Sequence, residues 1–155
     1  MKSKLIETLK LNKSIVKLGL QIHSFGNASL RYKNFCMIKP SGANIAKLKY
    51  SEISVVNIID GKVVSGKKPS VDLDTHLLIY KNFPEINSII HTHSVYATSW
   101  AQAKKEIPCF GTTHADYYFN QIPITKSLTI KKVNKNYEYE TGKSKQVRQC
   151  SKGQN

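Results

Sequence analysis

Two histidines separated by one residue, His91 and His93, are the sharpest chemical feature of this sequence. They follow the apolar residues Ile89 and Ile90, which indicates the end of a buried strand. Residues i and i+2 of a strand project to the same face, so both imidazoles can bind one metal ion. Zinc accepts two or three imidazoles plus a carboxylate and keeps one position open for substrate. The spacing therefore predicts a zinc site, and two separate surface histidines are the alternative.

Three short turns rich in Gly, Ser and Pro lie upstream, at residues 26–29, 40–42 and 69–70. Backbone N–H groups and hydroxyls in such turns, together with the ammonium group of Lys39, are suited to hold a phosphate or a sugar oxygen. The alternative for each is an ordinary turn.

A carboxylate stands beside a cluster of hydroxyls in residues 112–116, which include Thr112 and Asp116. Asp116 is a candidate acid or base for proton transfer. The alternative is that Asp116 caps a helix. His23, His76 and His114 are further candidate ligands, although most isolated histidines are structural.

These residues need a scaffold, and the apolar pattern predicts helices alternating with single strands and a hairpin. The hairpin is predicted at Asp60-Gly61, where a β-branched run meets a Lys-Val-Val segment. The expected arrangement is a mixed, layered α/β domain. The predicted elements are a helix in 1–20, a loop at 23–29, strands at 34–38, 53–59, 62–64 and 88–93, and helices at 74–82 and 95–103.

The 155 residues, of which 40% are hydrophobic, are enough for one domain with a buried core. No apolar run approaches the roughly 20 residues that span a bilayer, so no membrane partner is expected. Three widely spaced cysteines suggest neither a disulfide framework nor a cysteine zinc site, and we expect a cytoplasmic protein.

The net charge of +14 raises the question of nucleic-acid binding. The basic residues are 22 Lys and only 2 Arg, and Arg supplies the bidentate fork that reads guanine. We therefore interpret the lysines as a solvated surface and expect no nucleic-acid partner.

The motifs together, in their order, are similar to the class II aldolase/adducin family, from about residue 5 to Gly142. Segments 100–103 (Trp-Ala-Gln-Ala) and 111–117 (Gly-Thr-Thr-His-Ala-Asp-Tyr) resemble its L-ribulose-5-phosphate 4-epimerase branch in particular. The resemblance implies an α/β/α domain with a central mixed or antiparallel sheet over residues 1–142. The polar residues 143–155 are interpreted as a disordered or out-of-frame tail, so that the fold is incomplete at the C-terminus.

The resemblance also implies roles for individual residues. His91 and His93 would bind one zinc ion per subunit, and Asp72 would lie near or on the metal. Asp116 would be the catalytic acid or base. The residues implied to bind the sugar-phosphate substrate are Gly26, Asn27, Lys39, Ser41, Gly42, Ser70, Val71 and Thr112.

The implied reaction is a retro-aldol cleavage and re-formation of the C3–C4 bond of L-ribulose 5-phosphate. Zinc would polarise the C2 carbonyl, and inversion at C4 would give D-xylulose 5-phosphate, in arabinose or ascorbate degradation. The family usually forms a symmetric homotetramer with its sites between subunits.

Three departures from the family pattern bear on activity. Val71 replaces a second phosphate-binding serine, no histidine follows His114 to serve as the third zinc ligand, and a C-terminal catalytic tyrosine is missing. We therefore expect a truncated gene product that is inactive as an epimerase. The alternatives are a class II aldolase of the fuculose-phosphate type and a non-catalytic remnant or interaction module.

Overall fold

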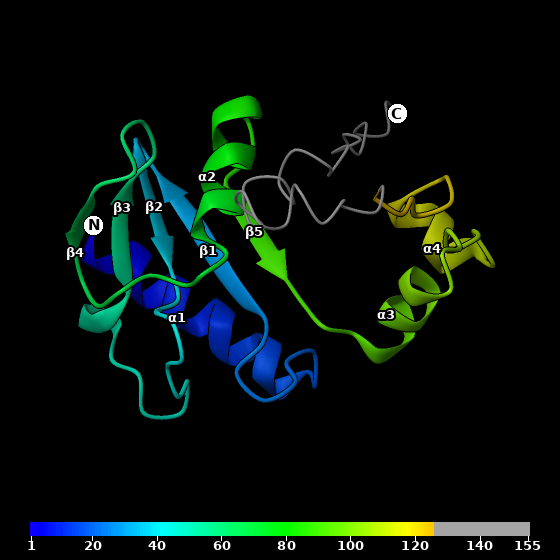
Figure 1. Cartoon of the computed structure of the whole chain (residues 1–155), viewed down its shortest axis with the longest axis horizontal. Coiled ribbons are helices and arrows are strands. Elements are labelled where there is room, and N and C mark those ends of the chain that lie inside the picture. Colours follow the sequence, from blue (N-terminus) through cyan, green and yellow to red (C-terminus); the bar gives the residue numbers. More distant parts are fainter. Residues whose placement is uncertain (126–155) are drawn as a thin grey trace, which may run out of the picture.

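A computed structural model describes residues 1–125 as a five-stranded sheet with helices around it (Figure 1). The predicted tail at 143–155 lies outside the described residues. In chain order the elements are α1 (Lys2–Lys17), β1 (Asn27–Tyr32), β2 (Phe35–Ile38), the 3-10 helix η1 (Tyr50–Glu52), β3 (Ser54–Asn57), β4 (Val63–Ser65), α2 (Leu73–Asn82), β5 (Ser88–His91), α3 (Val95–Gln102) and α4 (Thr112–Tyr117).

The strands lie in the order β4-β3-β2-β1-β5, and each neighbouring pair among these described strands is antiparallel. Of the two arrangements expected, mixed or antiparallel, the structure has the antiparallel one. Asn27, the first residue of β1, is the register partner of His91, the last residue of β5. This register brings the loop before β1 beside the predicted histidine pair.

Helices cover both faces of the sheet, which confirms the α/β/α layering. Successive strand residues point to opposite faces, and β2 shows this directly. Met37 packs with Val55 in a cluster that includes Leu5 and Leu9 of α1, and Cys36 packs with residues of α2 in a second cluster. The second cluster comprises Cys36, Ile38, Val56, Ile58, Leu77 and Tyr80.

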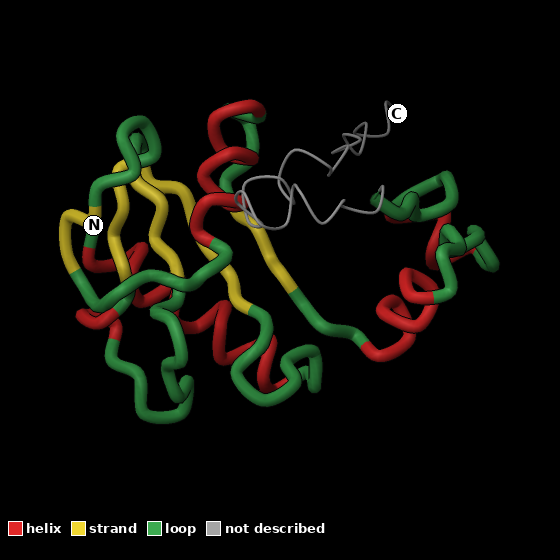
Figure 2. The backbone as a smooth tube through the Cα atoms, viewed as in Figure 1, coloured by secondary structure: helices red, strands yellow, loops and turns green. Residues whose placement is uncertain are grey.

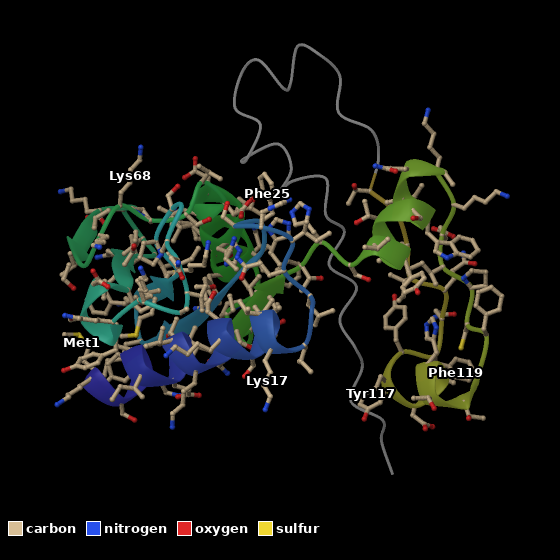
Figure 3. The ribbon with its side chains drawn as sticks, turned by 90° about the horizontal axis from the view of Figure 1, so that it is seen from below. Met1, Lys17, Phe25, Lys68, Tyr117 and Phe119 are labelled. Atoms are coloured by element: carbon tan, nitrogen blue, oxygen red, sulfur yellow. The ribbon has the colours of Figure 1, made fainter. Side chains whose placement is uncertain are left out.

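Helices α3 and α4 lie apart from the sheet, beyond the loop that follows β5 (Figure 2), and they do so in both the view of Figure 1 and the turned view of Figure 3. Within the described part of the chain neither helix has a buried residue. Tyr117 and Phe119, which are 82% and 85% exposed, lie on this separate part of the molecule (Figure 3). Apolar side chains are thus left uncovered by residues 1–125.

Most predicted elements are confirmed with shifted ends, and one prediction is wrong. The residues expected to form a loop at 23–29 include the start of β1, because Asn27 and Ser29 join the ladders on either side. The structure also forms a short helix at α4 that the pattern did not indicate. No helix in residues 1–125 combines the length and apolar composition that crossing a membrane requires.

Candidate active site

One carboxylate oxygen, Asp72 Oδ2, gathers side chains from three segments of the chain. Asp72 is the N-cap residue of α2, and Oδ2 lies 3.1 Å from His91 Nδ1 at the end of β5. The same oxygen accepts hydrogen bonds from Asn27 Nδ2 at the start of β1 and, at 3.3 Å, from the Ser70 hydroxyl. The structure therefore joins four of the residues predicted from the sequence into one cluster, the Asp72 cluster: Asn27, Ser70, Asp72 and His91.

The partners of Asp72 keep its carboxyl group ionised. Partial burial by itself raises the pKa of Asp72, but the hydrogen bond and charge of His91 and the hydrogen bond of Asn27 outweigh it, and the pKa falls to about 2. A permanent negative charge therefore faces the histidine pair at neutral pH.

The two histidines stay adjacent although only His91 belongs to β5. Their ring centroids are 4.8 Å apart, and the His93 ring also lies 5.6 Å from that of Phe25. With Nδ1 of His91 turned to a carboxylate, that nitrogen carries the proton and leaves Nε2 as the free lone pair. Burial, and then the charge of His91, lowers the pKa of His93, which favours its neutral, metal-binding form.

The side chains of this cluster are of the types that bind zinc, but there are fewer of them than a catalytic zinc site requires. Imidazole and carboxylate are zinc ligands, and catalytic zinc sites have three protein ligands. Among residues 1–125 no group of three or more His, Cys, Asp and Glu is placed to hold a metal ion. Two of the other candidate histidines have contacts outside the pair: His76 Nδ1 contacts the buried Ser29 hydroxyl, although His76 also acts electrostatically on Asp72, and the ring of His114 contacts the Asn120 carbonyl oxygen.

Of the residues predicted to bind the phosphate group, some are buried and others are exposed. Lys39 is only 3% exposed, and its ammonium donates to the Ser24 carbonyl oxygen at 3.2 Å. Burial lowers the pKa of Lys39, and the charge of Asp72 partly opposes this. Ser41 and Gly42 form an exposed turn at the end of the same segment, with Gly42 at a φ of +62°.

Residues 69–72 reach the sheet through backbone contacts. The Ser70 N–H donates to the Lys39 carbonyl oxygen at 3.1 Å, which places the Ser70 side chain beside Asn27. Val71, in contrast, is 66% exposed. The substitution of valine at this position therefore leaves the buried part of the cluster intact.

The Asn27 side chain is buried and only half satisfied. Its nitrogen donates to Ser70 and Asp72, whereas its oxygen, Oδ1, has no hydrogen-bond partner among the described residues. The acceptor-only carboxylate of Asp72 fixes which end of the amide is the nitrogen. Oδ1 is thus suited to a donor such as a sugar hydroxyl, rather than to a phosphate oxygen.

The structure does not bring Thr112 and Asp116 to the Asp72 cluster, because both lie on the separate helix α4. Asp116 is exposed, and it lies inside α4, whose N-cap is Gly111. The alternative that Asp116 caps the start of a helix is therefore wrong.

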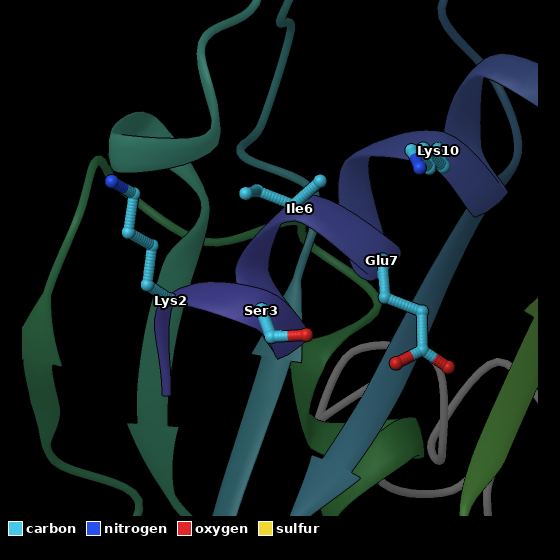
Figure 4. Close-up of a pocket in the computed structure, with 5 residues that line it drawn as sticks. All are labelled: Lys2, Ser3, Ile6, Glu7 and Lys10. Carbon is cyan, nitrogen blue, oxygen red and sulfur yellow. The ribbon is translucent and has the colours of Figure 1, made fainter.

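The first turns of α1 form a surface pocket that is separate from the predicted site (Figure 4). None of the predicted site residues lines it. Its lining residues are Lys2, Ser3, Ile6, Glu7 and Lys10.

The sequence did not indicate two contacts that shape the site. The Leu20 carbonyl oxygen accepts from the His93 N–H at 3.3 Å, and Phe25 packs against the His93 ring. Both come from the segment between α1 and β1, whose path depends on tertiary structure rather than on local pattern.

Comparison with known proteins identifies the family of this chain. A family model described as "Class II Aldolase and Adducin N-terminal domain" matches residues 6–147. The "probable L-ribulose-5-phosphate 4-epimerase UlaF" of Mycoplasma pneumoniae is 46% identical over 151 residues, which are 92% of this chain and 62% of that protein. The L-ribulose-5-phosphate 4-epimerase UlaF of Salmonella typhi is 44% identical over 135 residues, 85% of this chain and 59% of that protein. The chain thus spans about three fifths of the length of these curated relatives.

Solved structures share the fold. An L-fuculose 1-phosphate aldolase has a TM-score of 0.74 at 26% identity, over 91% of this chain and 68% of that chain. The L-fuculose-1-phosphate aldolase of Thermus thermophilus has a TM-score of 0.73 at 19% identity, over 93% and 72% of the two chains, and this likeness concerns the fold alone. Since the family model covers most of the sequence, the chain belongs to the class II aldolase and adducin N-terminal domain family.

Proposed function

We propose that this chain contributes the substrate- and metal-binding part of an L-ribulose-5-phosphate 4-epimerase, which forms D-xylulose 5-phosphate. The observation that carries the proposal is the meeting of Asn27, Ser70 and His91 at Asp72. The names of the relatives at 44–46% identity support this choice of reaction.

Metal dependence is typical of this family, and zinc is our specific proposal. His91 and His93 would hold a zinc ion, which when bound supplies an electrophile for the ketose carbonyl. Asp72 orients His91 through Nδ1 and so directs Nε2 toward the bound metal.

The remaining residues of the cluster bind and orient the sugar phosphate. The Lys39 ammonium and the turn at Ser41-Gly42 attract the phosphate, and Asn27 Oδ1 accepts a hydrogen bond from a sugar hydroxyl. Ser70 holds the Asn27 amide in place at 3.2 Å. A buried acceptor left unsatisfied costs free energy, so a substrate hydroxyl that satisfies Asn27 gains affinity.

The bond change is a reversible cleavage between C3 and C4. A base takes the C4 hydroxyl proton, the pair of electrons of the C3–C4 bond stays with the three-carbon fragment, and glycolaldehyde phosphate forms. The aldehyde turns its other face before the bond re-forms and the proton returns. Asp116 is the proposed proton carrier, with Thr112 beside the substrate.

A homotetramer with sites between subunits is part of the proposal, because α4 lies apart from the Asp72 cluster of its own chain. The exposed apolar side chains Tyr117 and Phe119 support an interface near Asp116. Light scattering on the purified chain tests this, and a monomer at all concentrations would contradict it.

The free thiols of Cys36 and Cys109 support a cytoplasmic location.

An aldolase acting on a fuculose-type sugar phosphate is the second candidate, favoured by the structural neighbour at 26% identity. Both reactions begin with cleavage of the same kind of bond. They differ in whether the aldehyde fragment is released or recaptured on its other face.

Calorimetric titration of the zinc-supplemented chain tests the substrate assignment. L-Ribulose 5-phosphate should bind at least about tenfold more tightly than L-ribulose and than L-fuculose 1-phosphate. Ser70→Ala should weaken that binding, whereas Ser88→Ala, at an exposed position of β5, should not. Equal affinity for L-ribulose with and without phosphate would contradict the proposal, and a preference for L-fuculose 1-phosphate would favour the aldolase.

A further inference from the structure

The buried face of α1 contains two polar side chains at positions where apolar side chains are usual. Thr8 and Asn12 are 0% and 1% exposed and lie one helical turn apart, in line with the buried Ile15. Burying an amide is costly unless its hydrogen bonds are made. The bonds that Asn12 makes outside its own helix therefore account for its presence there.

Asn12 pairs with both backbone polar groups of Ala28 in β1. Its Nδ2 donates to the Ala28 carbonyl oxygen at 3.0 Å, and its Oδ1 accepts from the Ala28 N–H at 2.9 Å. Nδ2 also donates to the Thr8 carbonyl oxygen at 2.9 Å, so the amide is fully engaged. The side chain thus acts on Ala28 as a neighbouring strand would.

The sheet explains why Ala28 needs this partner. Alternate residues of a strand turn their N–H and C=O groups to opposite neighbours. The Arg31 N–H bonds to Asn87 on the β5 side, so the groups of Ala28 face the β2 side. The β1–β2 register ends at the pair of Ser29 and Ile38, one residue short of Ala28. Asn12 continues that ladder by one residue.

The residue next to Ala28 is Asn27, whose side chain meets Asp72 and Ser70. On the other side of Asn27 stands Gly26, with a φ of +96° in the left-handed region and only 3.0 Å between its would-be Cβ and the His91 carbonyl oxygen. Asn27 therefore lies between a glycine in a closely packed turn and a residue held by α1. Because Ala28 and Asn27 share a peptide bond, a shift of Ala28 displaces the Asn27 backbone as well.

We propose that Asn12 is a positioning residue: by completing the β1 ladder at Ala28, it holds the Asn27 amide against Asp72 and Ser70. Its importance for substrate binding rests on the proposed function, whereas its effect on Ala28 and Asn27 does not. Asn12 itself touches neither the proposed metal ligands nor the substrate residues.

The test compares Asn12→Leu with Thr8→Val in the full 155-residue chain. Leucine has the same branched shape as asparagine, although it is larger, and it forms helices better, so we expect the variant to stay folded and to keep a cooperative thermal transition. Thr8→Val is the matched control, because Thr8 is equally buried on α1 but its hydroxyl donates only to the Lys4 carbonyl oxygen of the same helix.

Amide hydrogen exchange gives the first readout. In Asn12→Leu the Ala28 amide should exchange at least about tenfold faster, while the amide of Met37 in β2 keeps its rate. The side-chain amide resonances of Asn27 should shift as well. Thr8→Val should leave both unchanged. Equal acceleration at Ala28 and Met37 would mean a loss of overall stability only, and would overturn the proposal, as would no change at Ala28.

Binding of L-ribulose 5-phosphate gives the second readout. The dissociation constant should rise about tenfold in Asn12→Leu and stay within about twofold in Thr8→Val. Selective exchange at Ala28 with no binding by the parent chain would refute the proposed function and leave the positioning of Asn27 standing. Faster exchange at the Ala28 amide alone, with unchanged affinity for L-ribulose 5-phosphate, would refute the importance of Asn12 for substrate binding.

A second variant guards against misfolding of the first. Asn12→Asp keeps the shape and the acceptor for the Ala28 N–H but turns an oxygen toward the Ala28 carbonyl. It should shift the side-chain amide resonances of Asn27 and weaken binding in the same direction as Asn12→Leu, while the Ala28 N–H keeps its acceptor. Parent-like values for both measurements would overturn the proposal.

Discussion

Asn27 and His91 are partners across the β1–β5 ladder, and the side chains of both contact the same atom, Asp72 Oδ2. The carboxylate comes from the start of α2, so three elements converge on one oxygen. Asp72 thereby orders an amide on one side and an imidazole on the other. Several of the expected results below depend on this arrangement.

Asp72→Asn should weaken metal binding without removing a histidine. An amide at this position cannot hold the charge that orients His91, and loss of such a partner typically costs about 10- to 100-fold in metal affinity. Titration with Co²⁺, followed by its visible absorption, measures the affinity. Asp60→Asn, in the exposed turn after β3, is the control. Unchanged Co²⁺ affinity in Asp72→Asn would show that the 3.1 Å contact has no part in metal binding.

Zinc should be held weakly by the chain itself. His91 and His93 provide two imidazole ligands, and residues 1–125 do not gather a third strong ligand. Dialysis against a mild chelator should therefore remove the metal, and His91→Ala and His93→Ala should each abolish binding. His114→Ala should have no effect, since the His114 ring contacts Asn120 on the separate part of the molecule. Stoichiometric zinc after dialysis, or its loss on changing His114, would contradict this ligand set.

Thiol labelling should separate Cys36 from Cys109. Burial raises the pKa of Cys36 to about 12, and it lies between the sheet and α2, whereas Cys109 is exposed. In a Cys150→Ser background, Cys109 should react at once and Cys36 only as the domain opens. Because the Cys36 thiol is protonated and enclosed in the folded domain, its labelling should be limited by opening, so urea should accelerate it without changing the labelling of Cys109. Rapid labelling of both thiols in the native protein would contradict the layered core.

The Ser29 hydroxyl should contribute more to the free energy of unfolding than the Tyr80 hydroxyl that it contacts. Ser29 Oγ lies 2.7 Å from His76 Nδ1 and 2.8 Å from the Tyr80 hydroxyl, and Ser29 is fully buried. Ser29→Ala removes both contacts and should lower the free energy of unfolding by about 1–3 kcal/mol, and Tyr80→Phe, which removes one, should lower it less. Urea unfolding gives both values. A larger loss in Tyr80→Phe would show that the Ser29–His76 contact contributes little.

The sequence predicted the elements whose pattern is local. The helix at α1 and the hairpin between β3 and β4 have apolar spacing or turn residues that specify them without tertiary context. The sequence also predicted Asp72 and the histidine pair, through their types and spacing and through the resemblance to a family.

The start of strand β1 was not predicted, because residues 26–29 (Gly-Asn-Ala-Ser) are small and polar, which is typical of a turn. Asn27, Ser29 and Arg31 alternate along the strand, and each makes hydrogen bonds to α2 or to the residues at its ends. Residues 27–32 do alternate polar and apolar side chains, but this period is masked where the strand begins inside the turn-like segment. Its side-chain partners lie more than 40 residues away in sequence.

The position of Asp116 was beyond prediction for another reason. Its motif suggests a catalytic group, but motifs do not state the distance between a residue and its site. In the structure Asp116 lies on α4, away from the Asp72 cluster. Whether it takes part in chemistry is decided by assembly or by movement of α4, neither of which is written in a local pattern.

Conversion of L-ribulose 5-phosphate to D-xylulose 5-phosphate is the most direct measurement of the central claim. A coupled assay compares the 155-residue chain with a chimera in which the residues after Gly142 are replaced by the corresponding segment of the Mycoplasma pneumoniae relative. The chain alone should show no turnover, since its described residues gather no third metal ligand. The chimera should form D-xylulose 5-phosphate, and His91→Ala in the chimera should abolish this. Turnover by the chain alone would contradict the incomplete site. A folded, zinc-loaded chimera that forms no D-xylulose 5-phosphate, or that only releases glycolaldehyde phosphate, would contradict the epimerase assignment.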